Sequence, residues 1–314
     1  MKLRTYKQVN NEKGYIDEAL SEASDKAILY LVEEEATSGI QINKDRIISL
    51  FLETLYSSID IDNPSEKERL DFHIPLILVT SMDGFYVYFI DDYEGSDGQT
   101  LYKKKWSKKY PFYYEDEDFI YRFSLSDIIT LYDKKNLLGP ANGQRIFTLN
   151  AKDLVNLDKF EGFRKRRPES FLLTSTDFYQ VRKSIITDSI ENALNNYCNR
   201  HNEVAKKLGI SYHFHLPTIS GEITKAIDSP ALIVLMQGYP LTSNENMVFN
   251  RLAISSSQLV KKKLYILEEK DQSLIYHRSD CKELLEQETN KQKSFYSVWQ
   301  AAKEGGLPCN MCIN

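Results

Sequence analysis

The chain has 314 residues, 42% of them hydrophobic and 12% aromatic, which suffices for a large core and predicts two domains plus a small C-terminal module. Its net charge of −5 argues against a protein whose whole surface binds nucleic acid, although local basic patches can override the average. No apolar run is long enough to cross a bilayer and the start of the chain is polar, so we expect a cytoplasmic protein without a membrane span or signal peptide.

Two amphipathic helices are predicted at the N-terminal end. Apolar residues at helical spacing from Ile16 to Leu31 predict a helix that ends near Gly39. A second helix is predicted to begin at an Asn43 cap and to carry a broad apolar face as far as Ile59. The sequence at 62–65, Asp-Asn-Pro-Ser, then breaks the helical pattern, so we expect both helices to face a core.

A β-hairpin is the clearest local prediction. The β-rich runs 74–80 and 85–90 are joined by a tetrapeptide whose Asp83-Gly84 pair suits a type I′ turn. Further strands are predicted at 101–106, 119–123 and 145–149. Helices followed by antiparallel strands predict an α+β domain over residues 1–160, and this order resembles sensor folds of the PAS, Cache and profilin-like kind.

A second α+β unit is predicted over residues 170–267. Thr174 can cap a long helix that runs to Gly209, and its later half carries apolar residues at alternating steps of four and three. Such a seam serves either a dimer contact or the core of its own domain, and its short length favours the core. The continuous apolar run 231–236 predicts a strand buried on both faces, and 259–267 predicts another strand.

Two pairs of side chains in this unit are weak candidates for chemistry. Cys198 and His201 lie one helical turn apart, as a nucleophile and its base would. Their place beside the apolar seam favours core residues instead. His213 and His215 would share one face of a strand and could join His73 or Glu222 in a metal site, but a surface pair is the favoured interpretation.

Two basic clusters are candidate nucleic-acid contacts. Lysines surround a tryptophan in the first cluster, with tyrosines close by, a mixture that suits phosphate contact and base stacking. Because an acidic run follows at 115–118, charge pairing between strands explains the same residues and is favoured. The candidate residues are Lys103, Lys104, Lys105, Trp106, Lys108 and Lys109 in the first cluster and Arg164, Lys165, Arg166 and Arg167 in the second.

The most specific pattern lies at the C-terminal end. His277, Cys281, Cys309 and Cys312 follow the spacing H-x3-C-x27-C-x2-C and use three of the four cysteines. Two short ligand pairs separated by a loop can converge on one tetrahedral zinc ion. Reduced cytoplasmic thiols also favour metal binding over disulfides. The pattern predicts one structural Zn²⁺ in a Cys3His module over residues 268–314; a Cys309/Cys312 redox pair is the weaker alternative.

Residues 275–314 resemble the metal-binding domain of the bacterial Ada repair protein and related small zinc modules appended to some nucleases. In those modules a YHxxxC motif precedes a helix with an alanine pair and a G-x-x-P-C-x-x-C turn. The corresponding residues here are 276–281, Ala301-Ala302 and 305–312. In the Ada protein a cysteine at the position of His277 accepts a methyl group. An imidazole lacks that nucleophilicity, so the resemblance implies a structural zinc rather than methyl transfer.

Two classes of function remain open. The favoured hypothesis is a non-enzymatic binding or assembly protein whose tail is secured by zinc, with a partner protein or ligand that the sequence does not identify. Zinc modules of this type are frequent in mobile-element and phage proteins, so the resemblance also implies a role in such a system. The alternative is a nucleic-acid-binding or nucleic-acid-processing protein that uses the clusters at 103–109 and 164–167. The familiar nucleotide-binding, hydrolase and metalloprotease motifs are absent from the sequence.

Overall fold

The computed structural model describes residues 2–38, 44–138, 145–210, 212–215, 223, 228–241, 248–256, 265–270, 273–278, 281, 293–295, 304–309 and 311–312. The chain divides into two compact units, residues 1–257 and residues 258–314.

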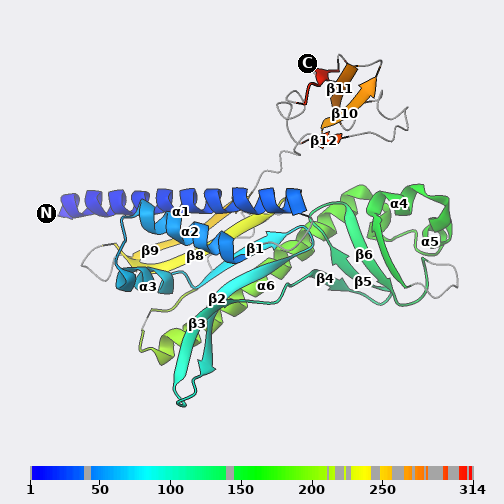
Figure 1. Cartoon of the computed structure of the whole chain (residues 1–314). Helices are drawn as coiled ribbons and strands as arrows, with labels where there is room; N and C mark the ends of the chain where they lie inside the picture. The colour runs from blue at the N-terminus through cyan, green and yellow to red at the C-terminus, as the bar shows by residue number, and fades with distance from the viewer. Residues whose placement is uncertain are drawn as a thin grey trace. The chain divides into compact units, whose positions relative to one another are not determined.

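The first unit combines helices with antiparallel sheets (Figure 1). Its α-helices are α1 (Lys2–Ser38), α2 (Lys44–Ser58), α3 (Pro64–Phe72), α4 (Ala151–Asn156), α5 (Glu161–Arg166) and α6 (Ser175–Lys207). Its strands are β1 (Leu76–Ser81), β2 (Gly84–Glu94), β3 (Thr100–Trp106), β4 (Phe112–Glu115), β5 (Phe119–Phe123), β6 (Ile128–Asp133), β7 (Ile146–Asn150), β8 (Ala231–Pro240) and β9 (Val248–Ser256). Short 3-10 helices cover Asp158–Phe160 and Phe171–Leu173. The predicted α+β class is confirmed.

A five-stranded antiparallel sheet, in the order β3-β2-β1-β8-β9, forms the middle layer of this unit. Helices α1 and α2 cover one face and α6 covers the other (Figure 1). Alternate residues of β1 enter the two cores: Leu76 and Leu78 face α6, whereas Ile77 and Val79 face α1 and α2. All four side chains are at most 1% exposed. The central strands are therefore buried on both faces, as predicted for 231–236.

The pairing of β1 with β8 joins distant parts of the sequence. Leu76 pairs with Leu235 and Val79 pairs with Leu232, so one sheet includes strands from both of the predicted domains. The expected division near residues 160–170 thus falls inside the first compact unit. The shared sheet and the shared cores therefore join, in one compact unit, the two segments that the sequence patterns predicted as separate domains.

A second sheet, in the order β4-β5-β6-β7, packs one face against α4, α5 and the N-terminal half of α6. Phe119 and Phe123 of β5 are at most 2% exposed and contact rings from these helices. Phe119 lies 5.9 Å from Phe163 of α5, and Phe123 lies 6.0 Å from Phe178 of α6, measured between ring centroids. Aromatic packing therefore attaches this sheet to the long helix.

The local predictions hold for several elements of this unit. The first two helices, the hairpin strands, the strands at 101–106, 119–123 and 145–149, and the long helix from 174 all form. The Asn43 cap lies outside the described residues. The buried seam of α6 packs into the first unit's own core, as favoured, with Ile190 and Leu194 fully buried.

Two local predictions need correction. The sequence at 62–65 begins a helix instead of only ending one, because the Asn63 side chain caps α3 by accepting from the Ser65 amide and Pro64 occupies the first helical position. The hairpin turn comprises Met82 and Asp83, whereas Gly84 already belongs to β2. Glycine is required at 84 because a Cβ there would collide with the Tyr110 carbonyl oxygen.

The second unit contains a small sheet in the order β12-β10-β11-β13. Its strands are β10 (Tyr265–Lys270), β11 (Ser273–Arg278), β12 (Lys293–Phe295) and β13 (Leu307–Pro308). The predicted strand at 259–267 lies partly outside the described residues, and the alanine-pair helix lies wholly outside them. Among the helices that the structure describes in either unit, none has the length and apolar character of a bilayer crossing.

Candidate metal centre

Strand pairing in the second unit brings distant cysteine and histidine residues together. His277 lies near the end of β11, and β13 pairs in parallel with that strand, with Tyr276 opposite Pro308. The Cys309 amide donates to the Tyr276 carbonyl oxygen at 3.1 Å, which continues the pairing beyond β13. Cys309 is therefore placed beside His277, although 31 residues lie between them in the sequence.

The four predicted metal ligands converge at this point. One ligand atom from each of His277, Cys281, Cys309 and Cys312 lies within 4.8 Å of all the others. His277 is 0% exposed, Cys281 and Cys309 are 4% and 3% exposed, and Cys312 is partly buried. No disulfide joins the cysteines. The cluster can therefore hold a metal ion, as the sequence pattern predicted.

The donor set fits a tetrahedral ion. Zn–S bonds of about 2.3 Å and a Zn–N bond of about 2.0 Å place tetrahedral ligand atoms about 3.7 Å apart, which lies within the 4.8 Å limit on the separations found here. The Met311 amide donates to Cys309 Sγ at 3.4 Å, and such N–H···S contacts stabilise a thiolate that binds a metal. Ile266 and Ile275 pack against the cluster and restrict solvent access. Four protein donors in this arrangement suit a closed, structural site.

The first basic cluster is divided between the two faces of strand β3. Lys104 and Trp106 face the helical layer: Lys104 Nζ donates to the carbonyl oxygens of Asp71 and Ile74 at 2.6 and 3.0 Å, and Trp106 Nε1 donates to Asp45. Burial lowers the pKa of Lys104 to about 8. Lys105 pairs with Asp91, whose other partner lies on α6.

The remaining lysines of this cluster are exposed. Lys109 pairs with Asp83, and Lys103 and Lys108 lie at the surface. The lysines at 103–109 therefore share no single face, and several of them have protein partners.

The second basic cluster serves the structure around α5. Arg164 donates to the Leu154 and Leu157 carbonyl oxygens at 2.9 Å each, where α4 ends. Lys165 pairs with Glu161 at 2.7 Å, and Arg167 pairs with Asp118 at 2.7 Å. Arg166 donates to the Gly162 and Leu137 carbonyl oxygens. Helix α5 lies beside the four-stranded sheet, at the other end of the unit from the β2–β3 hairpin (Figure 1).

The Cys198–His201 pair is buried in the core of the first unit. Burial raises the pKa of the Cys198 thiol to about 11. Burial and the nearby charge of Lys104 lower the pKa of His201 to about 3. His201 lies between the rings of Phe72 and Phe214, at centroid distances of 4.7 and 4.4 Å. A protonated thiol and a weak base suit core residues, which was the favoured interpretation.

His213 and His215 are exposed and lie outside any named strand. His73, the proposed third ligand, contacts the Gln237 carbonyl oxygen through Nδ1 at 3.0 Å. Glu222 lies outside the described residues. Within the described part of the chain, the only group of histidine, cysteine and acidic residues with metal-binding geometry is the one in the second unit.

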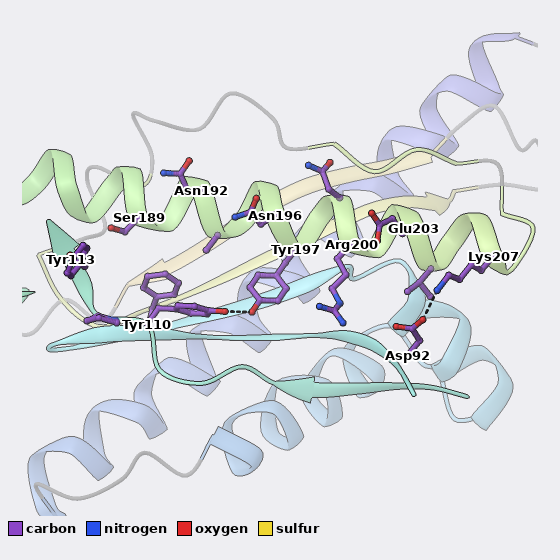
Figure 2. Close-up of a pocket in the computed structure, with 15 residues that line it drawn as sticks. Asp92, Tyr110, Tyr113, Ser189, Asn192, Asn196, Tyr197, Arg200, Glu203 and Lys207 are labelled. Atoms are coloured by element: carbon purple, nitrogen blue, oxygen red, sulfur yellow. Dashed lines mark hydrogen bonds and ion pairs between the residues drawn. The ribbon is translucent and has the colours of Figure 1, made fainter. Parts of the chain in front are cut away.

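A groove of about 740 Å³ beside α6 was not predicted from the sequence. Its wall is the exposed side of α6, and residues of β2, β4 and the preceding loop line the rest (Figure 2). Tyr110 and Tyr197 meet there, with their hydroxyl oxygens 2.7 Å apart. The sequence contained one relevant pattern, the repeated asparagines of α6 at 192, 196 and 199, but the facing residues come from segments more than 70 positions away.

Comparisons of the chain with models of protein families, with curated proteins and with solved structures find no match. The site must therefore be interpreted from its own geometry.

Proposed function

We propose that this chain is a non-enzymatic binding or assembly protein whose C-terminal unit folds around one structural zinc ion. The observation that carries the proposal is the convergence of His277, Cys281, Cys309 and Cys312 to within 4.8 Å. Three thiolates and an imidazole are a donor set that selects zinc among the common cellular cations, since magnesium and calcium prefer oxygen ligands. A closed set of four donors offers no position for a substrate, so the metal's role is to stabilise the fold.

We further propose that the second unit is an Ada-like zinc module with histidine in place of the first cysteine. The support is the order of motifs: YHxxxC at the end of β11 and the G-x-x-P-C-x-x-C turn around β13. A nucleophilic thiolate at the first position is replaced by an imidazole, which cannot accept a methyl group by the same route. The module therefore serves attachment or assembly in this protein.

Metal analysis and X-ray absorption test the zinc site. Protein purified without chelator should contain about one zinc per chain. The absorption spectrum should fit three sulfur neighbours at about 2.3 Å and one nitrogen at about 2.0 Å. A metal-free protein, or a coordination shell dominated by oxygen, would remove the proposal.

DNA binding at low salt separates this proposal from a nucleic-acid function. Because many of the cations at 103–109 and 164–167 already bind protein groups, we expect no affinity for single-stranded or double-stranded DNA that falls steeply with salt. Salt-sensitive binding that disappears when Lys103 and Lys108 are both changed to alanine would favour the nucleic-acid alternative instead.

A further inference from the structure

The groove beside α6, called the α6 groove below, is polar but has little charge to offer a ligand. Arg200 pairs with Asp91, and Lys207 pairs with Asp92 at 2.5 Å. Glu203 lies between them along the helix and forms no ion pair with any described residue. A phosphate or other anion would therefore find each lining cation occupied, whereas a ligand with a basic group would find one carboxylate available.

Helix α6 already binds the backbone of another segment of this chain through an asparagine. Asn202 of α6 binds both main-chain groups of Phe214: its Nδ2 donates to the Phe214 carbonyl oxygen at 2.7 Å, and the Phe214 amide donates to its Oδ1 at 2.7 Å. Gln237 of β8 binds both main-chain groups of His215 in the same way. Side-chain amides thus act as strand partners for residues 212–215, because an amide offers one donor and one acceptor just as a peptide group does.

Three other asparagines lie on the exposed side of α6 that lines the groove, about a quarter turn around the helix from Asn202. Asn192, Asn196 and Asn199 line the groove, are exposed, and make no hydrogen bond to any described residue. Figure 2 labels Asn192 and Asn196 on α6. At a rise of about 1.5 Å per residue, neighbouring members of this series stand about 4.5–6 Å apart along the helix axis. An extended chain repeats about every 6.6–6.8 Å, two residues at a time, which is about 1–2 Å longer than the asparagine spacing.

Tyrosines from both sides of the groove provide a rigid aromatic surface: Tyr197 comes from α6, and Tyr110 and Tyr113 come from the facing segment. Tyr110 stacks on Phe85 at 5.4 Å, and Tyr197 lies 4.4 Å from Phe89, both between ring centroids. Tyr110 and Tyr113 remain 40% and 45% exposed. Exposed tyrosines on a fixed support give a large contact area at low entropic cost, and asparagines add adaptable hydrogen bonds, the combination found in peptide-binding and antigen-binding surfaces.

We propose that the α6 groove binds an extended segment of a partner polypeptide. Asn192, Asn196 and Asn199 bond its backbone, the tyrosines contact its side chains, and Glu203 pairs with a lysine or arginine of the segment. This inference rests on the binding function proposed above and gives that function a site, but it does not depend on the zinc ion. The groove is formed entirely by the first unit.

Selection from a phage-displayed library of random linear peptides tests the proposal on the full zinc-containing chain. Enriched peptides should carry a basic residue and bind with a fluorescence-anisotropy change when synthesised. Changing Asn196 and Asn199 together to alanine should weaken binding at least tenfold, because two backbone hydrogen bonds are lost. Asn195→Ala is the matched control, since Asn195 is exposed on the same helix but does not line the groove.

Two further measurements identify what is recognised. N-methylation of one central amide of the peptide should weaken binding about as much as the double asparagine change, because backbone recognition needs that donor. Glu203→Gln should weaken peptides with a basic residue several-fold and leave analogues with alanine at that position unchanged. All variants alter exposed side chains, and equal thermal unfolding temperatures establish that they are folded.

Several results would overturn the inference. They are the absence of any enriched peptide, equal weakening by Asn195→Ala, or tolerance of backbone methylation. Oligosaccharide binding with the same asparagine dependence, measured on a glycan array, would replace the peptide with a sugar ligand. If peptides fail while the chain holds one zinc, the groove assignment alone is lost. If peptides bind and the metal is absent, the zinc proposal alone is lost.

Discussion

The two units of this protein are held together by different means. In the first unit, two hydrophobic cores enclose a five-stranded sheet and include many fully buried side chains, such as Leu20, Phe51 and Leu78. In the described part of the second unit, the buried side chains are few: Leu267, Tyr276 and the metal-ligand cluster itself. The first unit can therefore be stable through apolar burial, whereas we propose that the second depends on a metal ion held by its cysteine and histidine cluster.

Removal of the metal should produce the largest difference in stability between the two units. Structural zinc contributes roughly 10–16 kcal/mol to the folding of small modules at neutral pH, more than a unit of this size gains otherwise. A strong chelator should therefore unfold residues 258–314 and leave the first unit folded. Limited proteolysis followed by mass spectrometry should show new cleavage only beyond residue 257. Protection of the second unit after complete metal removal would contradict the comparison.

A substitution in the apolar core should destabilise the first unit and leave the second unit unchanged. Phe51 is 0% exposed in the core between α1, α2 and the sheet, so Phe51→Ala should destabilise the first unit by about 3–5 kcal/mol. Urea unfolding measures this change, and zinc content should stay the same. Leu29→Ala is the control, because Leu29 is 63% exposed and its loss should change stability by less than about 0.5 kcal/mol.

Acid should weaken the first unit through His201. Its pKa is lowered from 6.5 to about 3 in the folded chain, so the unfolded chain binds this proton more tightly. The stabilisation from neutral His201 is fully present above pH 6.5 and is lost as pH falls towards 3, by at most about 1.4 kcal/mol per pH unit and roughly 5 kcal/mol in all.

Stability curves from pH 7 to 4 measure this contribution against a variant. In His201→Leu, an apolar leucine side chain takes the place of the imidazole between Phe72 and Phe214. The slope of the unfolding free energy against pH should then fall by the contribution of one proton. Leu29→Ala, which changes an exposed side chain that does not titrate, should keep the slope of the original protein. Parallel curves for all three proteins would refute the assignment.

The smallest predicted effect is a difference in stability between variants of two neighbouring lysines in the first basic cluster. Lys104→Met should cost about 1–3 kcal/mol, because it removes the donor for the carbonyl oxygens of Asp71 and Ile74 at the end of α3. Lys103→Met on the exposed side of β3 should change unfolding free energy very little. Equal effects in thermal unfolding would mean that the two lysines have the same role.

Local features of this molecule could be predicted from sequence, and long-range partners could not. The hairpin at 76–94 and the long helix α6 follow from residue patterns that act over a few positions. The apolar pattern of β8 predicted burial on both faces, but nothing in that pattern names β1, about 150 residues earlier, as its neighbour. Asn63-Pro64 illustrates a local ambiguity, because residues that the sequence pattern assigns to a helix break cap the helix that follows, whereas α2 already ends at Ser58.

The candidate sites divide in the same way. The metal ligands could be found because cysteine and histidine at characteristic spacings have few other uses in a reduced protein. Basic residues have many uses. The backbone carbonyl oxygens that accept hydrogen bonds from Lys104 and Arg164 cannot be identified from the sequence. The α6 groove was missed because its lining residues come from three separate segments.

Native mass spectrometry of three matched proteins tests the central claim most directly. The original chain and Cys198→Ala, which removes a buried cysteine of the first unit, should each carry one zinc ion. Cys309→Ser, which removes a cysteine of the cluster, should lose the zinc ion. A metal-free original chain, or a Cys309→Ser protein that keeps its zinc as firmly as Cys198→Ala does, would contradict the account.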